Sequence, residues 1–454
     1  MNNIKESTRE LTSFLADLNY QSFSHTTVNM AKMCIQDLIA VAVAGSSKKE
    51  SNIWKKYYSS KPSNPESSIL QPGFPKASIE QAAALNAVFG HVMDMDDVYN
   101  ASMSHLGVIT IPTALALGQK LHKSGKQVIE AIVAGYEAGA RIGAAINPSS
   151  YKFWHTTGVT GTFTSAAVAG KLLGLTPEQF VHCFGSAGTQ SAGLWEFLES
   201  GSMSKVLHTA HANLCGIRSA ELAYLGFTGA PTILEGERGF VRALAPQFDM
   251  DCLTKDLGKS LRIDQNSFKP YACCRHTHSA DYCVEQILGD YSLNPNEIVS
   301  IVDDTYGTAV QLTDNPYPEN PYAAKFSLQY CIAAAIILKD LSDRAFTQEN
   351  ITNPNIKELM KKIQVRICPE LDEAFRLDPN QWSHRLTITL KNGEVITKQI
   401  DYPIGDFKNP FDSAMADRKF LTLTEDVLGN STSSRLLENI HNLDSLEDIN
   451  ILFS

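Results

Sequence analysis

Over about the first 260 residues, the spacing of apolar and polar positions predicts one helix after another. Residues 78–89 (SIEQAAALNAVF) begin with the pattern of a capping box, in which Ser78 is the N-cap and Gln81 is the third helical residue. Residues 125–146 and 161–175 are rich in Ala and Gly on more than one face, which indicates helices buried among other helices. This part of the chain therefore predicts an all-helical domain.

The pattern changes after about residue 260. Residues 298–306 (IVSIVDDTY) and 362–371 (KIQVRICPEL) are rich in β-branched residues that alternate with polar ones, as in strands. Residues 384–400 contain two alternating runs joined by Asn-Gly, which predicts a β-hairpin. Between them, residues 323–338 (AAKFSLQYCIAAAIIL) favour a buried helix. Strands and helices together predict an α/β or α+β unit.

Helical spacing returns from Asp406 onward, so we expect the C-terminal segment to pack back on the first domain. A chain of 454 residues is also too long for one compact core. We therefore predict a mainly α protein with an inserted α+β domain. Residues 1–266 and 405–454 would form the all-helical domain, and residues 267–404 the smaller α/β domain.

Composition narrows the functional class. A net charge of −10 is unfavourable for binding nucleic acid, whose phosphates require a basic surface. The first residues lack the apolar segment of a signal peptide, and the longest apolar runs are about half a membrane span. Nine cysteines without a CxxC pair fit a reducing compartment. We expect a cytoplasmic protein that binds neither nucleic acid nor membranes.

The sequence lacks the motifs of common cofactors. No GxG pattern follows a strand and opens a helix, and neither a Walker A motif nor HExxH is present. We therefore predict no organic cofactor, no cluster and no metal ion. One alternative stays open, in which His208 and His211, or His276 and His278, bind a divalent ion together with the aspartates of the segment DMDD. A helical enzyme of this kind would need a second metal motif.

Four polar clusters interrupt the apolar background, and each contains histidine. They are residues 90–107 (GHVMDMDDVYNASMSHLG), 153–161 (FWHTTGVTG), 200–216 (SGSMSKVLHTAHANLCG) and 268–282 (FKPYACCRHTHSADY). Each alone has a structural explanation: DMDD could be a solvated acidic loop or a helix N-terminus, and His155 a hydrogen-bonded histidine at the start of a helix. A lysine on a helix usually faces water, and adjacent cysteines are often buried hydrophobic residues. The density of reactive side chains in the last cluster is harder to explain in this way.

Together, the clusters suit one type of chemistry. Lysine and arginine supply fixed positive charges for carboxylates. Histidines supply an acid and a base near neutral pH, and an aspartate can orient a histidine or handle a proton itself. Such a set is suited to proton abstraction next to a carboxylate, because the developing enolate-like charge must be met by cations already in place.

The clusters and the later segment NPYPENPYAAKFSLQY resemble, in order and spacing, the MmgE/PrpD family, over nearly the whole chain. That family includes 2-methylcitrate dehydratase, cis-aconitate decarboxylase and iminodisuccinate epimerase. The resemblance implies a helical domain built from both chain ends, an inserted α/β domain, an active site between the two, a homodimer and no organic cofactor. Matched by motif, it points to Asp94, His105, His155, Lys205 and Lys269.

We therefore predict two sets of site residues. The catalytic set is Asp94, His105 and His155. The set that binds a small polycarboxylate substrate is Lys205, Lys269, Arg275, His276, Cys274 and His208.

The resemblance also shows departures. Val98 stands where family members often carry Thr or Ser, and Leu312 and Cys274 stand where the animal decarboxylases align with Tyr and His. The basic residues of the fourth cluster also differ from those of enterobacterial methylcitrate dehydratases. We predict a lyase that dehydrates a 2-methylcitrate-like hydroxy acid. The alternatives are epimerisation of a dicarboxylate, cis-aconitate-type decarboxylation, and a non-catalytic carboxylate-binding protein, which would not need paired histidines.

Overall fold

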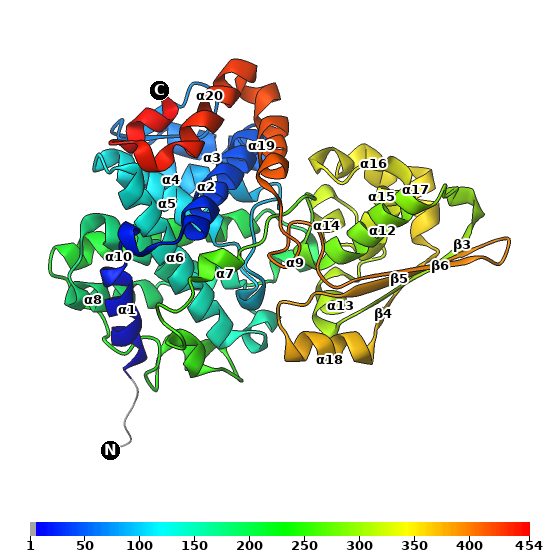
Figure 1. Ribbon diagram of the computed structural model, residues 1–454, viewed down its shortest axis with the longest axis horizontal. Coiled ribbons are helices and arrows are strands. Elements are labelled where there is room, and N and C mark those ends of the chain that lie inside the picture. The colour runs from blue at the N-terminus through cyan, green and yellow to red at the C-terminus, as the bar shows by residue number, and fades with distance from the viewer. Residues whose placement is uncertain (1–5) are drawn as a thin grey trace.

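Helix α2 (His25–Gly45) lies at the centre of a large helical part of the computed structural model, which describes residues 6–454 (Figure 1). Ser24 caps this helix by accepting a hydrogen bond from the Thr27 amide. Among the described residues, α2 is the one helix long and apolar enough to cross a membrane, and 72% of its most apolar stretch is buried inside the protein. Burial of this extent is typical of a core helix.

The helical part continues through the first half of the chain. Its further α-helices are α1 (Ser7–Asp17), α3 (Lys49–Ser59), α4 (Ile79–His91), α5 (Gly107–Lys120), α6 (Gly125–Ile146), α7 (Thr156–Leu173), α8 (Pro177–Gly188), α9 (Phe197–Ser200), α10 (Lys205–Tyr224) and α11 (Phe240–Leu244). Two strands of two residues each, β1 (Ser67–Ser68) and β2 (Lys76–Ala77), precede α4 in the chain and pair with each other. Helix α7 packs against both α6 and α10, and α10 packs against α4.

The predicted cap of α4 forms only in part. Ser78 accepts a hydrogen bond from the Gln81 amide, as expected. The Gln81 side chain, however, donates to the carbonyl of Pro62 instead of turning back to the N-cap. A neighbouring loop has therefore taken the partner that completes a capping box.

The C-terminal helices α19 (Ser413–Leu428) and α20 (Asn430–His441) pack against α2, so segments from both halves of the chain build the helical part (Figure 1). Gln36 donates to Asp417 over 2.8 Å. Lys419 pairs with the buried Asp37. These contacts hold the last segment against the helical part after the chain has returned from the inserted part.

The inserted part contains a four-stranded mixed sheet in the order β4-β3-β5-β6. Its strands are β3 (Ile298–Thr305), β4 (Ile363–Ile367), β5 (His384–Leu390) and β6 (Val395–Ile400). Strands β3 and β4 are parallel, whereas β5 is antiparallel to both β3 and β6. Gly393, at φ +86°, closes the predicted hairpin between β5 and β6.

Helices cover both faces of this sheet. The helices of the inserted part are α12 (His278–Asp290), α13 (Gly307–Thr313), α14 (Pro321–Ala324), α15 (Leu328–Leu338), α16 (Gln348–Thr352), α17 (Pro354–Met360) and α18 (Pro369–Leu377). In Figure 1, α12, α15 and α17 lie on one side of the sheet and α18 on the other. The predicted class, mainly α with a small α+β part, is confirmed.

Candidate active site

The loop between α4 and α5 carries the aspartates of the first cluster and is held firmly in place. Asp97 accepts hydrogen bonds from the Gly107 amide (3.0 Å), the Tyr136 hydroxyl (2.6 Å) and the Asn266 side chain (2.7 Å). All of these groups are buried. Burial, followed by the charge of Asp37, raises the pKa of Asp97 to about 7. Asp97 therefore fixes the loop rather than facing the reacting atoms.

Two lysines from distant elements converge on Asp94. Lys205, the first residue of α10, places Nζ 2.8 Å from Oδ2, and Lys269 places Nζ 2.7 Å from Oδ1. Lys269 also donates to the Asp94 carbonyl. Burial alone would raise the pKa of Asp94, but the two ammonium groups outweigh it and hold the pKa well below its usual range. The triad therefore carries one surplus positive charge.

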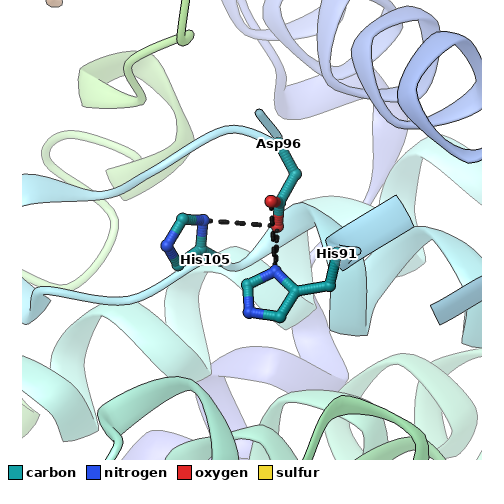
Figure 2. A group of neighbouring side chains, drawn as sticks. All are labelled: His91, Asp96 and His105. Atoms are coloured by element: carbon teal, nitrogen blue, oxygen red, sulfur yellow. Dashed lines mark hydrogen bonds and ion pairs between the residues drawn. The ribbon is translucent and has the colours of Figure 1, made fainter. Parts of the chain in front are cut away.

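A second aspartate of the loop joins two histidines, as Figure 2 shows. His91 Nδ1 lies 2.8 Å from Asp96 Oδ2, and His105 Nδ1 lies 3.2 Å from the same oxygen. The other nitrogen of His105, Nε2, lies 3.8 Å from Asp94 Oδ1. Burial lowers the pKa of His91 to about 4 despite the nearby Asp96, so His91 is neutral at pH 7. His105 thus connects the two aspartates.

His155, the N-cap of α7, meets His208 in the first turn of α10. The two Nδ1 atoms are 3.1 Å apart. Helices α7 and α10 can approach this closely because α7 carries glycine at the contact: a Cβ on Gly161 would lie 2.8 Å from the Ala212 Cβ, and one on Gly158 would lie 3.1 Å from the His208 Cβ. Burial, followed by the charge of His208, lowers the pKa of His155 well below its usual value.

The fourth cluster brings three further side chains from the inserted part. His276 Nδ1 lies 2.5 Å from the Tyr306 hydroxyl. Burial raises the pKa of the Cys274 thiol to about 12, so this thiol is protonated at pH 7. Arg275 donates to Asp406 over 3.0 Å and is 4% exposed. The guanidinium predicted to bind substrate is therefore paired across the join between the two parts of the protein.

The histidine rings form a continuous group. His91 stands edge-on to His105 at 4.8 Å between ring centroids and stacks on His155 at 5.8 Å. His155 in turn contacts Trp195 at 4.7 Å. Trp195 lies edge-on to Tyr151 at 5.2 Å, and Tyr151 lies 6.1 Å from His276. Most of the predicted residues therefore share one buried region, formed by Asp94, His105, His155, Lys205, Lys269, Cys274 and His276, with the half-buried His208 at its edge.

Buried polar atoms without a partner mark the inside of this region. Among the described residues they include Nε2 of His91, His155 and His276, the indole nitrogen of Trp195 and the hydroxyl of Tyr322. A buried polar group without a hydrogen bond is costly, so each of these atoms requires an explanation, and a ligand between them would supply one. These atoms are available to a substrate.

The departures at positions 98 and 312 lie in different parts of the structure. Val98 is buried, and its backbone forms an antiparallel bridge with Ser267. Its side chain is aliphatic and therefore adds no hydrogen bond to the site. Leu312, on α13, is only partly buried.

Sequence reasoning missed several of these residues. His91 and Asp96 belong to the first cluster, but nothing in their spacing tells which of its two histidines faces a substrate. Trp195 lies outside the four clusters and Tyr322 lies in the later segment NPYPENPYAAKFSLQY, and both reach the site only through the fold. A signal that would find them is a buried hydroxyl or indole nitrogen left without a partner, which is visible in three dimensions alone.

A pH-dependent stability follows from the buried histidines. A histidine kept neutral in the folded state is protonated more readily after unfolding, so its contribution to stability is complete above pH 6.5 and is lost as the pH falls. Burial lowers the pKa of five histidines: His91, His155, His208, His276 and His278. Asp97 and Asp281, whose pKa values burial raises to about 7, act in the opposite sense.

Burial also raises the pKa of Asp37, Glu137, Glu221 and Asp264, which act in the same sense as these two carboxyls. Only Asp97 and Asp281 are raised as far as about 7, whereas all five histidines lose their contribution in this range, so we expect the free energy of unfolding to fall between pH 6.5 and 4. Urea unfolding at pH 7.0, 5.5 and 4.5, followed by circular dichroism, measures it. A free energy that is constant or rises on acidification over this range would show that these histidines are charged in the folded protein.

The same geometry permits one alternative use of the histidines. His91, Asp96 and His105 offer three ligand atoms within 4.8 Å of one another, and two imidazoles with a carboxylate are a familiar set for a divalent cation. Outside this region, Cys273, Asp281 and Cys331 form a second such group. In the first group, Asp96 already accepts the His91 hydrogen bond, so the aspartate orients the ring without an ion.

Two known protein domains cover most of the chain. The chain matches the MmgE/PrpD N-terminal domain over residues 9–253 and the MmgE/PrpD C-terminal domain over residues 271–445. It therefore belongs to the MmgE/PrpD family, and the predicted resemblance is confirmed.

Similar proteins in this family include two cis-aconitate decarboxylases. The human protein is 24% identical over 99% of this chain and 94% of its own length. The protein of Aspergillus terreus is 28% identical over 82% of this chain and 80% of its own length.

Proposed function

We propose that this protein is a lyase that acts on a small di- or tricarboxylate by proton transfer at a carbon next to a carboxylate, without a cofactor. The reaction we propose first is the dehydration of a 2-methylcitrate-like hydroxy acid. The observation that carries the proposal is the placement of neutral, buried histidines beside a triad of Lys205, Asp94 and Lys269 with a surplus positive charge.

Each part of the site has a role in this reaction. The lysines attract the substrate carboxylates, and their charge stabilises the enolate-like intermediate. His155, whose Nε2 is buried and unpartnered, and His105, which lies against Asp96, are the candidates for base and acid. Asp94 is held ionised by both lysines, so it orients them rather than donating a proton.

A second reaction, decarboxylation of a cis-aconitate-type substrate, has separate support. The two similar proteins described above both carry the name cis-aconitate decarboxylase, and the human one matches over nearly the whole chain. Positions 274 and 312 count against the second reaction, since Cys274 and Leu312 stand where the animal decarboxylases align with His and Tyr. Both reactions use the same cationic region and a proton carrier.

A panel of substrates followed by proton NMR separates these possibilities. Purified enzyme would be incubated with citrate, 2-methylcitrate, cis-aconitate and an iminodisuccinate-type dicarboxylate. With 2-methylcitrate we expect loss of water to change the methyl doublet into a singlet on the new double bond, and with citrate to give a vinyl proton signal. Loss of CO2 from cis-aconitate would establish the second reaction, and inversion without loss of any group would establish an epimerase. Binding without conversion of any compound would indicate a carboxylate-binding protein.

We expect full activity after exhaustive chelation, because Asp96 and the lysines supply the orientation and charge that a metal ion would otherwise provide. The measurement compares turnover before and after dialysis against EDTA, together with elemental analysis of the protein. Loss of activity on chelation and its return with magnesium or zinc would instead assign His91, Asp96 and His105 as metal ligands.

A further inference from the structure

We propose that His208 is a proton relay that connects the buried His155 with solvent, and that it does not bind the substrate directly. This inference rests on the proposed function, in which His155 takes up or supplies a proton at the substrate. His208 acts through His155 and is therefore a positioning residue. The sequence alone places it among the substrate ligands.

The contact between the two rings has a defined chemistry. Their Nδ1 atoms are 3.1 Å apart, a distance at which one nitrogen must carry the hydrogen and the other must accept it. When His155 donates, its Nε2 is a free lone pair and can act as a base. When His208 donates, the hydrogen of the neutral His155 ring lies on Nε2, which can then act as an acid. The His208 ring therefore selects the form of His155.

The opposite ends of the pair face different surroundings. His155 is 1% exposed, and its Nε2 is buried without a partner in the region of the lysines. His208 is only partly buried. Its Nε2 has no hydrogen-bond partner in residues 6–454 and is not among the buried unpartnered atoms, so water reaches it. A path of two rings thus leads from the substrate region to solvent.

The path is held in register by its neighbours. Gly158 and Gly193 lie against the His208 side chain, where a Cβ on Gly193 would come within 3.3 Å of the His208 Nδ1. Phe197 stands edge-on to the His208 ring at 5.7 Å. Burial lowers the pKa of His208 to about 4, so the pair is neutral at pH 7 and one hydrogen lies between the rings.

The transfer balances without any further reactant. A proton leaves the substrate carbon for His155 Nε2, while the electron pair of the C–H bond stays on the substrate. The hydrogen on His155 Nδ1 moves to His208 Nδ1, and the hydrogen on His208 Nε2 leaves to water. Both rings remain neutral at the end, with their hydrogens on the opposite nitrogens. Reversal of the same steps delivers a solvent proton to an intermediate, as a decarboxylation requires.

His208→Asn tests the relay, since an asparagine side chain can keep a hydrogen bond to His155 but cannot pass a proton on. With enzyme in excess over substrate, we expect a first turnover within about two-fold of the wild-type rate. Steady-state turnover should fall at least about ten-fold, because His155 cannot be reset. His211→Asn is the matched control: His211 lies one turn further along α10 and bonds to the Gln190 carbonyl. It should behave like the wild type.

Two kinetic outcomes would overturn the proposal. Steady-state turnover of His208→Asn equal to the wild type would show that water reaches His155 by another way. An equal fall in the first turnover and in the steady state would show that His208 contributes to substrate binding or chemistry directly.

A second measurement keeps the test independent of the substrate. In protein labelled with ¹⁵N-histidine, two-bond ¹⁵N–¹H correlations report which ring nitrogen carries the hydrogen. We expect His155, identified by comparison with His155→Gln, to populate both tautomers in the wild type and one tautomer in His208→Asn. The same tautomer in both proteins would overturn the relay. A change in tautomer in a protein that converts none of the carboxylates would support the relay and contradict the proposed function.

Discussion

Replacing His155 with glutamine should lower turnover at least about 100-fold, because glutamine can accept a hydrogen bond but cannot take up a proton. His105→Gln should cause a loss of similar size. Both side chains are buried, and both lie in the group of rings around the lysine triad. The measurement is steady-state turnover on the substrate identified by the NMR panel, with folding checked by circular dichroism.

Solvent exchange distinguishes the roles of the two histidines. The variant that lacks the base should lose both turnover and exchange of the substrate hydrogen with deuterium. The variant that lacks the acid should lose elimination but retain exchange, provided that the carbanion forms first. His122→Gln is the control, since this side chain is 74% exposed and pairs with Asp448 at the surface. Near-normal turnover in folded His155→Gln and His105→Gln would show that these histidines are structural.

Asp94→Asn should destabilise the fold by about 3–5 kcal/mol, because it leaves two buried ammonium groups without a counter-charge. Lys205 and Lys269 are 2% and 0% exposed, and Asp94 is their common partner. Adding Lys269→Met to Asp94→Asn should recover part of this loss, since one buried charge is then removed. Urea unfolding of the single and double variants measures both effects.

The chain offers a matched control for this substitution. Asp256 has the same left-handed backbone as Asp94, with φ +55° in both, and it also pairs with a lysine, Lys259. This pair is exposed, so Asp256→Asn should leave the midpoint of urea unfolding close to that of the wild type. If Lys269→Met lowers the stability of Asp94→Asn further, the lysines are not held as a charged triad.

The sequence predicts the secondary structure well where local chemistry decides it. The alternation around the Asn-Gly pair that ends at Gly393 predicts the β5–β6 hairpin, because only a tight turn fits that pattern. The Ala- and Gly-rich segments predict buried helices because small residues on several faces leave no polar face for solvent. Helices α6 and α7 are almost entirely buried. The capping box at Ser78 stays incomplete because the Gln81 side chain bonds to the Pro62 carbonyl of a neighbouring loop, which no local pattern reveals.

For the site, motif order identifies the residues but not their partners. Nothing in the sequence shows that Lys205 and Lys269, 64 positions apart, bind opposite oxygens of one carboxylate. Likewise, the pairing of Arg275 with Asp406 depends on the return of the chain from the inserted part. Charges that look free along the chain are neutralised by residues that only tertiary structure brings close.

Proton NMR in D2O, with each compound of the panel and metal-free enzyme, is the most direct test of carbon–hydrogen proton transfer at this site. We expect deuterium to appear at a carbon next to a carboxylate in one substrate or its product, and to be absent with His155→Gln. Folded wild-type enzyme that incorporates no deuterium into any of these carboxylates, or does so only when a divalent ion is restored, would contradict a cofactor-independent proton transfer by these histidines.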